Sequence, residues 1–246
     1  MINAAIKILK KEGIFSFFRR SFTYLMRLIW FPVCAIRVKK FNNKKSREEI
    51  IDFVFNKIFG ILRPLQVREE ISELAKIVED KKPKTILEIG TAKGGTLFIF
   101  SKIAYQKATI ISVDLPGGAF GGGYPRSRAK LYSRFALPLQ KIFLLRMNSH
   151  ENETFEKVKN LLGERKIDFL FIDGDHTYQG VKIDFEKYSY LVKKGGLIAL
   201  HDVAVHPVET KCEVYKFWNE LQKKYNSREI IKNKEQGWGG IGIIKK

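Results

Sequence analysis

Short apolar segments alternate with longer amphipathic ones along most of the chain. Five apolar runs lie at 84–90, 108–114, 141–147, 167–173 and 195–202. Apolar residues recur at helical spacing in the stretches 94–105, 152–162 and 178–192, and also in a segment around Ile71 to Val78 that precedes the first run. Apolar strands alternating with helices are typical of a parallel sheet that is covered on both faces. The pattern therefore predicts an α/β fold.

Two more strands are predicted near the end of the chain, at 228–233 and 239–246. Only a few residues join them, whereas a parallel pair needs a crossover of about a dozen residues or more. We therefore expect an antiparallel pair and a sheet of seven strands.

The stretch 116–125, PGGAFGGGYP, is too rich in glycine for a packed element and is predicted to be a mobile loop. Arg126 and Arg128 follow it. If the loop closes over a ligand, these arginines are expected to contact a phosphate or carboxylate of that ligand. The alternative is that the segment is an ordinary flexible surface loop.

The length of 246 residues fits one domain with an appendage, and the charge is concentrated in that appendage. The formal net charge is +19, and residues 1–47 contain one acidic residue, Glu12. The basic residues of this segment are Lys7, Lys10, Lys11, Arg19, Arg20, Arg27, Arg37, Lys39, Lys40, Lys44, Lys45 and Arg47. We accordingly divide the chain into a basic helical extension at 1–46 and a main domain at 47–246.

The extension is predicted to contain an amphipathic helix. Its apolar stripe consists of Phe15, Phe18, Phe22, Leu25 and Ile29. Arginines interrupt the apolar run and Pro32 would end or kink it, so we expect no membrane span, and no signal-peptide cleavage site follows. The helix is expected to lie on the anionic inner face of the membrane, or else to pack on its own domain or on a second copy of the chain.

The two cysteines, Cys34 and Cys212, lie far apart without the spacing of a disulfide framework or of a zinc site. Their number and spacing favour a reducing, cytoplasmic location.

Ligands of open α/β sheets bind beyond the carboxyl ends of the strands, so the residues that follow each apolar run are candidates for a site. After the first strand comes LEIGTAKGGT, 87–96, in which Gly90, Gly94 and Gly95 would let the backbone approach a ligand. The spacing is neither GxGxxG nor that of a P-loop. Asp114 ends the second strand, where a carboxylate can bind a ribose. Together these residues predict a nucleoside-type ligand, although each alone could belong to an ordinary turn.

Four segments in order, ILEIGTAKGGT, ISVDL, FIDGDHTYQGV and GGLIALHDV, resemble the class I S-adenosylmethionine-dependent methyltransferases. The resemblance is closer to the group that includes catechol-type, macrocin-type and sugar-directed O-methyltransferases, and it covers roughly residues 65–246. It implies a Rossmann-like sheet of order 3-2-1-4-5-7-6 with strand 7 antiparallel. It also implies S-adenosylmethionine as cofactor.

The resemblance assigns cofactor contacts residue by residue. Glu88 and Gly90 would face the methionine part of the cofactor, with Thr91 and Gly94 in the same loop, and Asp114 would face its ribose. The segment of Asn148 and Ser149 would lie near adenine, with a helix N-cap as the alternative role for Ser149.

The resemblance also implies a metal site at Asp173, His201 and Asp202, which end the fourth and fifth strands. Catechol-type relatives have an Asp-Asn pair where this chain has His201-Asp202, which puts the metal in question. Mg²⁺ or Mn²⁺ would suit this donor set. Asp173 would also take part in catalysis.

His176 stands where those relatives carry a lysine that removes the substrate proton, and imidazole can serve as a general base. The alternative is that His176 bonds to backbone while Asp175 or Thr177 caps the next helix. Nothing in the sequence fixes a role for His150 or His206.

The resulting hypothesis is an S-adenosylmethionine-dependent O-methyltransferase that acts on a hydroxyl of a glycan, glycolipid or related small molecule at the cytoplasmic face of a membrane. Methylation of RNA is an alternative that the terminal position of the charge disfavours. A non-catalytic membrane-associated scaffold and an NAD-linked oxidoreductase are further alternatives. Homodimers are common among such relatives, but no interface is evident in the sequence.

Overall fold

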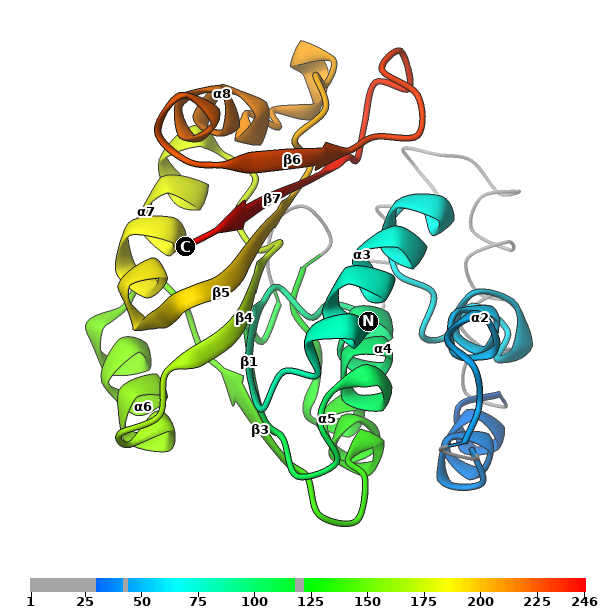
Figure 1. Cartoon of the computed structure of the whole chain (residues 1–246). Helices are drawn as coiled ribbons and strands as arrows, with labels where there is room; N and C mark the ends of the chain where they lie inside the picture. Colours follow the sequence, from blue (N-terminus) through cyan, green and yellow to red (C-terminus); the bar gives the residue numbers. More distant parts are fainter. Residues whose placement is uncertain (1–29, 42–43, 118–121) are drawn as a thin grey trace, which may run out of the picture.

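The computed structural model describes residues 30–41, 44–117 and 122–246. Seven strands form one sheet in the order β3-β2-β1-β4-β5-β7-β6 (Figure 1). All neighbouring strands are parallel except that β7 runs antiparallel to both β5 and β6. The strands are β1 Thr85–Ile89, β2 Thr109–Asp114, β3 Lys141–Arg146, β4 Ile167–Ile172, β5 Val192–His201, β6 Ser227–Ile230 and β7 Ile241–Lys245. The predicted fold class, strand order and antiparallel final strand are confirmed.

Helices cover both faces of the sheet and form two separate hydrophobic cores (Figure 1). The first face carries α3 (Arg68–Lys81), α4 (Gly95–Ile103) and α5 (Arg126–Tyr132), and the second carries α6 (Asn152–Leu162), α7 (Tyr178–Tyr188) and α8 (Val214–Lys224). Strands β1 and β2 are buried along their whole length because both of their faces pack on helices. This burial explains why the strands appear in the sequence as continuous apolar runs.

Two elements differ from the sequence prediction. Helix α8 was not predicted, although Val214, Phe217, Trp218 and Leu221 lie at helical spacing and are all buried. Helix α7 ends at Tyr188, and a 3-10 turn then leads into β5, which begins at Val192. The helix predicted at 178–192 is therefore shorter than expected, and the strand predicted at 195–202 begins at Val192 instead.

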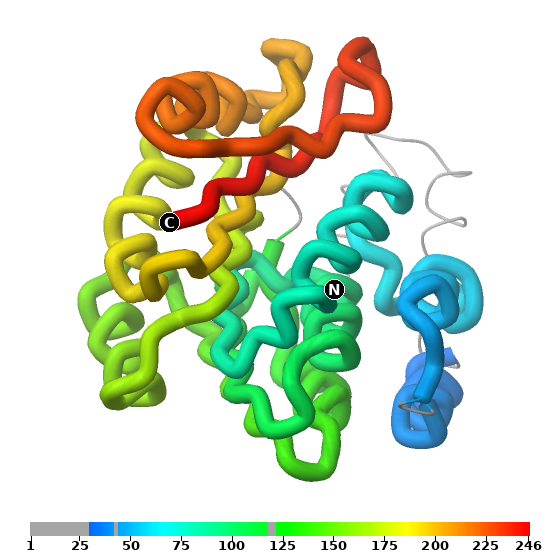
Figure 2. Tube along the Cα trace, in the orientation of Figure 1, coloured from blue at the N-terminus to red at the C-terminus, as the bar shows by residue number. Residues whose placement is uncertain are grey.

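The described part of the N-terminal extension packs on the first helical layer. Residues 30–39 are helical and lie outside α4, next to α2 (Arg47–Asp52) and the π-helical turn Phe53–Lys57 (Figure 2). Cys34 and Val38 are buried in the same core as α3 and α4. Residues 30–41 are thus continuous with the core of the domain.

The sequence analysis predicted that the extension contains an amphipathic helix and that it does not span a membrane. The predicted amphipathic stripe of Phe15 to Ile29 lies outside the described residues. No helix among the described residues is long and apolar enough to cross a bilayer.

Glu70 of α3 joins the first helical layer to the loop between β6 and β7. It is 1% exposed, and its two carboxylate oxygens accept hydrogen bonds from the backbone N–H groups of Lys232 (3.0 Å) and Gly240 (2.8 Å) and from the side chain of Gln236 (2.7 Å). A buried carboxylate is tolerated when such donors surround it. This contact holds the loop that in turn approaches the end of β5.

We predict that Glu70→Ala destabilises the fold by about 2–3 kcal/mol, because it leaves buried backbone donors without an acceptor. The adjacent Glu69→Ala is the matched control, since Glu69 is exposed and forms only a surface ion pair with Lys232. Urea unfolding of the two variants and of the parent chain measures the difference. Equal midpoints for the two variants would contradict this role of Glu70.

Candidate functional site

A cleft runs along the carboxyl ends of the parallel strands and consists of two adjoining cavities. The space between atoms in them is about 600 and 630 Å³, part of which is open to solvent. The first is lined by the glycine loop after β1 together with the polar residues Gln66, Asp173, His176, His201 and Asp202. The second is lined among others by Asn148, Ser149, His150 and Asp175. Gly90, Asp114, Gly122 and Gly174 border both cavities, so the two form one continuous site.

Gly90 lies where the segments after β1 and β4 come closest. Its φ is +90°, and a Cβ atom there would lie 1.8 Å from the backbone oxygen of Asp173. The Asp173 N–H donates to the Ile89 carbonyl at 2.8 Å, and the Gly90 N–H donates to the Val113 carbonyl at 2.9 Å. Only glycine fits this position, both for its backbone conformation and for its lack of a side chain. The predicted ligand loop and Asp173 therefore share one wall of the cleft.

Asp114 organises the glycine loop through its carboxylate. One oxygen accepts the backbone N–H groups of Thr91 (3.0 Å) and Ala92 (2.7 Å), and the other accepts those of Leu115 (2.7 Å) and Gly123 (3.0 Å). Burial raises the pKa of Asp114, although the four backbone donors favour its ionised form. Asp114 thus borders both cavities and holds together the loops on either side of it.

Glu88 lies beneath this loop and is fully buried. Thr91 Oγ1 donates to Glu88 Oε2 at 3.0 Å, while Oε1 has no hydrogen-bond partner. Burial raises the pKa of Glu88 to about 8, and the nearby carboxylates of Asp114 and Asp173 act in the same direction. Burial thus favours the neutral form of Glu88, which supports the loop from below, whereas Gly90 and Thr91 line the cavity itself.

The predicted adenine segment lies in the second cavity. Ser149 does not cap the next helix, because the residue at the N-cap of α6 is Glu151. His150 also lines this cavity, and its Nε2 lies 3.6 Å from Oδ1 of the fully buried Asp184. Interaction with this carboxylate raises the pKa of His150 against the effect of partial burial. His150 was singled out in the sequence without a role, and its position makes it a candidate for ligand contact.

The three predicted metal ligands converge at the ends of β4 and β5. Their ligand atoms lie within 4.8 Å of one another. His201 Nδ1 lies 3.0 Å from Asp173 Oδ1 and 3.3 Å from Asp202 Oδ2, and His201 Nε2 is buried without a partner. Burial opposes charge on His201, but the carboxylates of Asp202 and Asp173 outweigh it and hold its pKa well above the usual range. His201 Nδ1 thus faces two carboxylate oxygens in the middle of the cluster.

His176 joins this cluster from the loop before α7. Its Nδ1 lies 3.2 Å from Asp202 Oδ2, and its Nε2 lies 3.6 Å from Asp173 Oδ1. Thr177 caps α7 by accepting the Gly180 N–H at 3.0 Å, and Asp175 accepts the Thr177 N–H at 2.9 Å. The capping alternative thus holds for Asp175 and Thr177, while the His176 side chain faces two carboxylates in the first cavity.

Two further polar residues support the cluster and were not assigned from the sequence. Gln66 Nε2 donates to Asp173 Oδ2 at 2.9 Å, and Gln66 lines the first cavity. His206 Nε2 lies 3.1 Å from Asp202 Oδ1. Burial alone would lower the pKa of His206, but the contact with Asp202 and further hydrogen bonds outweigh burial and raise this pKa to about 10. Gln66 precedes α3 and His206 lies five residues beyond β5, so neither position follows a strand directly.

Of the two arginines after the glycine-rich loop, Arg128 is held by hydrogen bonds to neighbouring segments. Arg128 Nη1 donates to the Ile61 carbonyl at 3.0 Å and to Lys93 and Tyr132 at longer distances. It therefore braces α5 against the loop after β1. The tip of the predicted mobile loop, residues 118–121, lies outside the described residues.

Residues 87–203 match a family model described as a methyltransferase domain. A curated relative, an uncharacterized protein of Acanthamoeba polyphaga mimivirus, is 30% identical over 150 residues, which make up 61% of this chain and 64% of that protein. The chain thus spans less than two thirds of the length of this relative.

Two solved structures are similar in fold. The O-methyltransferase from Bacillus cereus, in complex with SAH, is 16% identical with a TM-score of 0.53, covering 82% of this chain and 92% of that chain. The O-methyltransferase TomG from Streptomyces achromogenes, involved in tomaymycin synthesis and in complex with SAM, is 15% identical with a TM-score of 0.54, covering 82% and 90%. At these identities the likeness concerns the fold alone.

We predict that Glu88 makes stability depend on pH. Its folded-state pKa of about 8 lies above the ordinary value of 4.5, so its contribution is complete below about pH 4.5 and is lost as pH rises through 8. The parent chain should therefore lose stability between pH 5 and 9, on the order of 3 kcal/mol more than Glu88→Gln, which cannot ionise. Urea unfolding at several pH values measures this, with exposed Glu153→Gln as control. Parallel pH profiles for parent and Glu88→Gln would refute the assignment.

The strand order, the cleft at the carboxyl ends of the strands and the match over residues 87–203 agree with one another. The chain therefore has the fold of the class I S-adenosylmethionine-dependent methyltransferases, and its residues 87–203 match the model of a methyltransferase domain.

Proposed function

We propose that this protein is an S-adenosylmethionine-dependent O-methyltransferase that acts on a hydroxyl of a glycan, glycolipid or related small molecule. One observation carries the proposal: the same cavity is lined by the glycine loop after β1 and by His176 and Asp173. A cofactor loop and a candidate base thus face one space. Methyl transfer from a sulfonium to an oxygen requires chiefly that the two reactants be aligned and that a proton be removed.

The cofactor would lie across both cavities. In this proposal Gly90, Thr91 and Gly94 approach its methionine part, supported from below by Glu88, while Asp114 faces the ribose. Ser149 borders the cavity that would hold adenine. Gln66 Oε1 is buried without a hydrogen-bond partner and could accept a hydrogen bond from the ligand.

His176 is the proposed general base. Asp202 and Asp173 face its two nitrogens at 3.2 and 3.6 Å, so the imidazolium that forms when the acceptor hydroxyl loses its proton would be stabilised on both sides. Gln66 orients Asp173 from behind, and His206 orients Asp202. These contacts position His176 beside the acceptor. The proposed methyl transfer is a direct displacement and involves no covalent enzyme intermediate.

The cluster of Asp173, His201 and Asp202 fits a divalent cation such as Mn²⁺ or Mg²⁺. Two carboxylate oxygens and one imidazole nitrogen lie within 4.8 Å of one another and could ligate the cation together. When bound, the cation would lower the pKa of an acceptor hydroxyl and hold it. The residues themselves orient the acceptor and His176 whether or not the cation is present.

Membrane association is proposed for the N-terminal extension and is the basis for preferring glycans and glycolipids as acceptors. In the described part, Arg37, Lys39, Lys40, Lys44 and Lys45 are exposed. Ile36 of the same helical stretch is 54% exposed. Basic and apolar side chains on one segment favour an anionic membrane surface. The extension would hold the cleft near acceptors at the cytoplasmic face.

We predict that His176→Asn lowers kcat for methyl transfer by about 10²- to 10⁴-fold and changes the Kd for S-adenosylmethionine less than about twofold. The measurement is transfer of the tritiated methyl group from S-adenosylmethionine to a panel of nucleotide sugars, glycolipids and catechols, beside calorimetric binding of the cofactor. Unchanged transfer by His176→Asn would exclude it as the base. Absence of transfer by the parent chain to every hydroxyl acceptor, with transfer to RNA, would overturn the proposed acceptor class.

For the membrane we predict that the full chain sediments with vesicles containing phosphatidylserine and not with vesicles of phosphatidylcholine alone. Replacement of Lys7, Lys10, Lys11, Arg19, Arg20 and Arg27 by Gln should reduce binding to the anionic vesicles by at least about tenfold, since each basic residue near the surface contributes about 1 kcal/mol. This variant keeps residues 30–41, which belong to the core. Equal sedimentation of both proteins would contradict the proposed role of the extension.

A further inference from the structure

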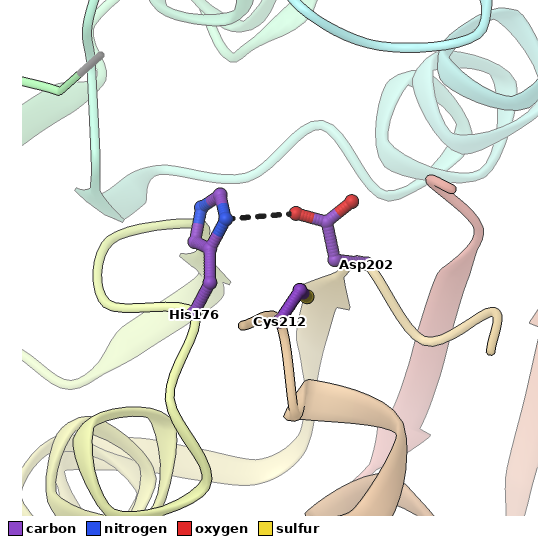
Figure 3. Close-up of side chains that lie close together, drawn as sticks. All are labelled: His176, Asp202 and Cys212. Carbon is purple, nitrogen blue, oxygen red and sulfur yellow. Dashed lines mark ion pairs between the residues drawn. The ribbon is translucent and has the colours of Figure 1, made fainter. Parts of the chain in front are cut away.

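Cys212 lies beside His176 and Asp202, although the three residues come from separate parts of the chain. His176 precedes α7, Asp202 follows β5, and Cys212 precedes α8. One ligand atom from each, a ring nitrogen, a carboxylate oxygen and Sγ, lie within 4.8 Å of one another. Figure 3 shows the three side chains converging, with the ion pair between His176 and Asp202 drawn as a dashed line. Asp202 and Cys212 are both 6% exposed.

The backbone holds the three residues in place. The Glu213 N–H donates to the His176 carbonyl at 2.7 Å, which joins the Cys212 segment to the His176 segment. The Cys212 N–H donates to Thr210 Oγ1 at 3.2 Å. The Glu213 bond therefore ties the loop before α8 to the loop before α7, and the Thr210 bond fixes the backbone at Cys212.

Asp202 is oriented so that one oxygen faces His176. Its Oδ1 lies 3.1 Å from His206 Nε2 and accepts the Gly239 N–H at 3.1 Å, which leaves Oδ2 toward His176 Nδ1. Partners of this kind orient a ligating carboxylate in metal sites. Asp202 also has φ of +63°, a conformation that an aspartate adopts only where its surroundings hold it.

This donor set adds a thiol to the carboxylate that it shares with the cluster of Asp173 and His201, since Asp202 Oδ2 faces both His176 Nδ1 and His201 Nδ1. Mg²⁺ prefers oxygen ligands, whereas thiolate and imidazole together select Zn²⁺ and similar cations. His176 and Asp202 also line the first cavity, so a cation held by these three residues could take a fourth ligand from the cleft, as zinc sites with an open position do.

We propose that His176, Asp202 and Cys212 form a binding site for Zn²⁺, and that occupation of this site inhibits the enzyme. The inhibitory part rests on the proposed function, because a cation on His176 Nδ1 takes the lone pair that a general base requires. Cys212 belongs to this site and not to the proposed catalytic groups. The thiol loses its proton when the cation binds, and no oxidant or reductant is involved.

The test uses Co²⁺ as a spectroscopic probe of the full chain. Cobalt bound to the thiolate gives a near-ultraviolet charge-transfer band, whereas cobalt bound only by Asp173, His201 and Asp202 does not. We expect the band in the parent chain, its displacement by Zn²⁺, and its loss in both Cys212→Ser and Cys212→Ala. Cys34→Ser is the matched control and should retain the band, since Cys34 is buried in the N-terminal layer.

Calorimetry of Zn²⁺ binding to the same proteins gives the second readout. Loss of Cys212 should weaken Zn²⁺ binding by at least about tenfold while the Kd for S-adenosylmethionine changes less than about twofold. Zn²⁺ should then inhibit methyl transfer by the parent chain and not by Cys212→Ser. Absence of the band in the parent chain, or its persistence without Cys212, would overturn the site even if methyl transfer is confirmed. If the band behaves as expected and no methyl transfer is found, the binding site stands and the proposed function falls.

Discussion

The close approach of the segments after β1 and β4 is the constraint on which the rest of the site depends. Gly90 and Asp173 touch through their backbones, and a single Cβ atom at Gly90 would lie 1.8 Å from the Asp173 oxygen. Because of this contact, the glycine loop and the Asp173 carboxylate belong to the same wall of the cleft. Asp114 holds that loop, and Asp173 faces His176. Both segments line one cavity because no side chain separates them, and the proposed function places cofactor and acceptor together there.

The polar cluster at the ends of β4 and β5 is stable only because its members pair with one another. Isolated charges at this depth would cost several kcal/mol each. Burial would raise the pKa of Asp202, but its contacts with His201, His206 and His176 outweigh that effect and hold the pKa well below the usual range. These contacts hold the imidazoles and carboxylates close together at the ends of β4 and β5.

Much of the fold follows from the sequence because the strands are buried on both faces and appear as continuous apolar runs. The hairpin of β6 and β7 could be predicted from the short connection between its strands. Helix α8 was overlooked although Phe217 and Trp218 mark its buried face. The rule that ligands bind beyond strand ends pointed to Asp114, whereas Asp173, His176 and Asp202 were assigned through the family resemblance. All four lie at or after strand ends and line the first cavity.

The same rule could not find Gln66 or Cys212. Gln66 comes from the segment before α3, and Cys212 from the loop before α8, so their proximity to the cleft depends on long-range packing. The spacing of the cysteines gave no sign of a metal site because the three candidate ligands lie on separate segments. Likewise the sequence placed Asp114 at the site but did not reveal that four backbone N–H groups hold its carboxylate.

The most direct test of the central claim is calorimetric titration of S-adenosylmethionine into the parent chain, Gly90→Ala and Gly117→Ala. A Cβ atom at Gly117 meets nothing within 4 Å, so this variant controls for glycine replacement near the cleft. We predict one site per chain in the parent and in Gly117→Ala, with affinity at least about tenfold weaker in Gly90→Ala, a loss of ~1.4 kcal/mol or more. No binding by the parent chain, or equal binding by all three proteins, would contradict the account.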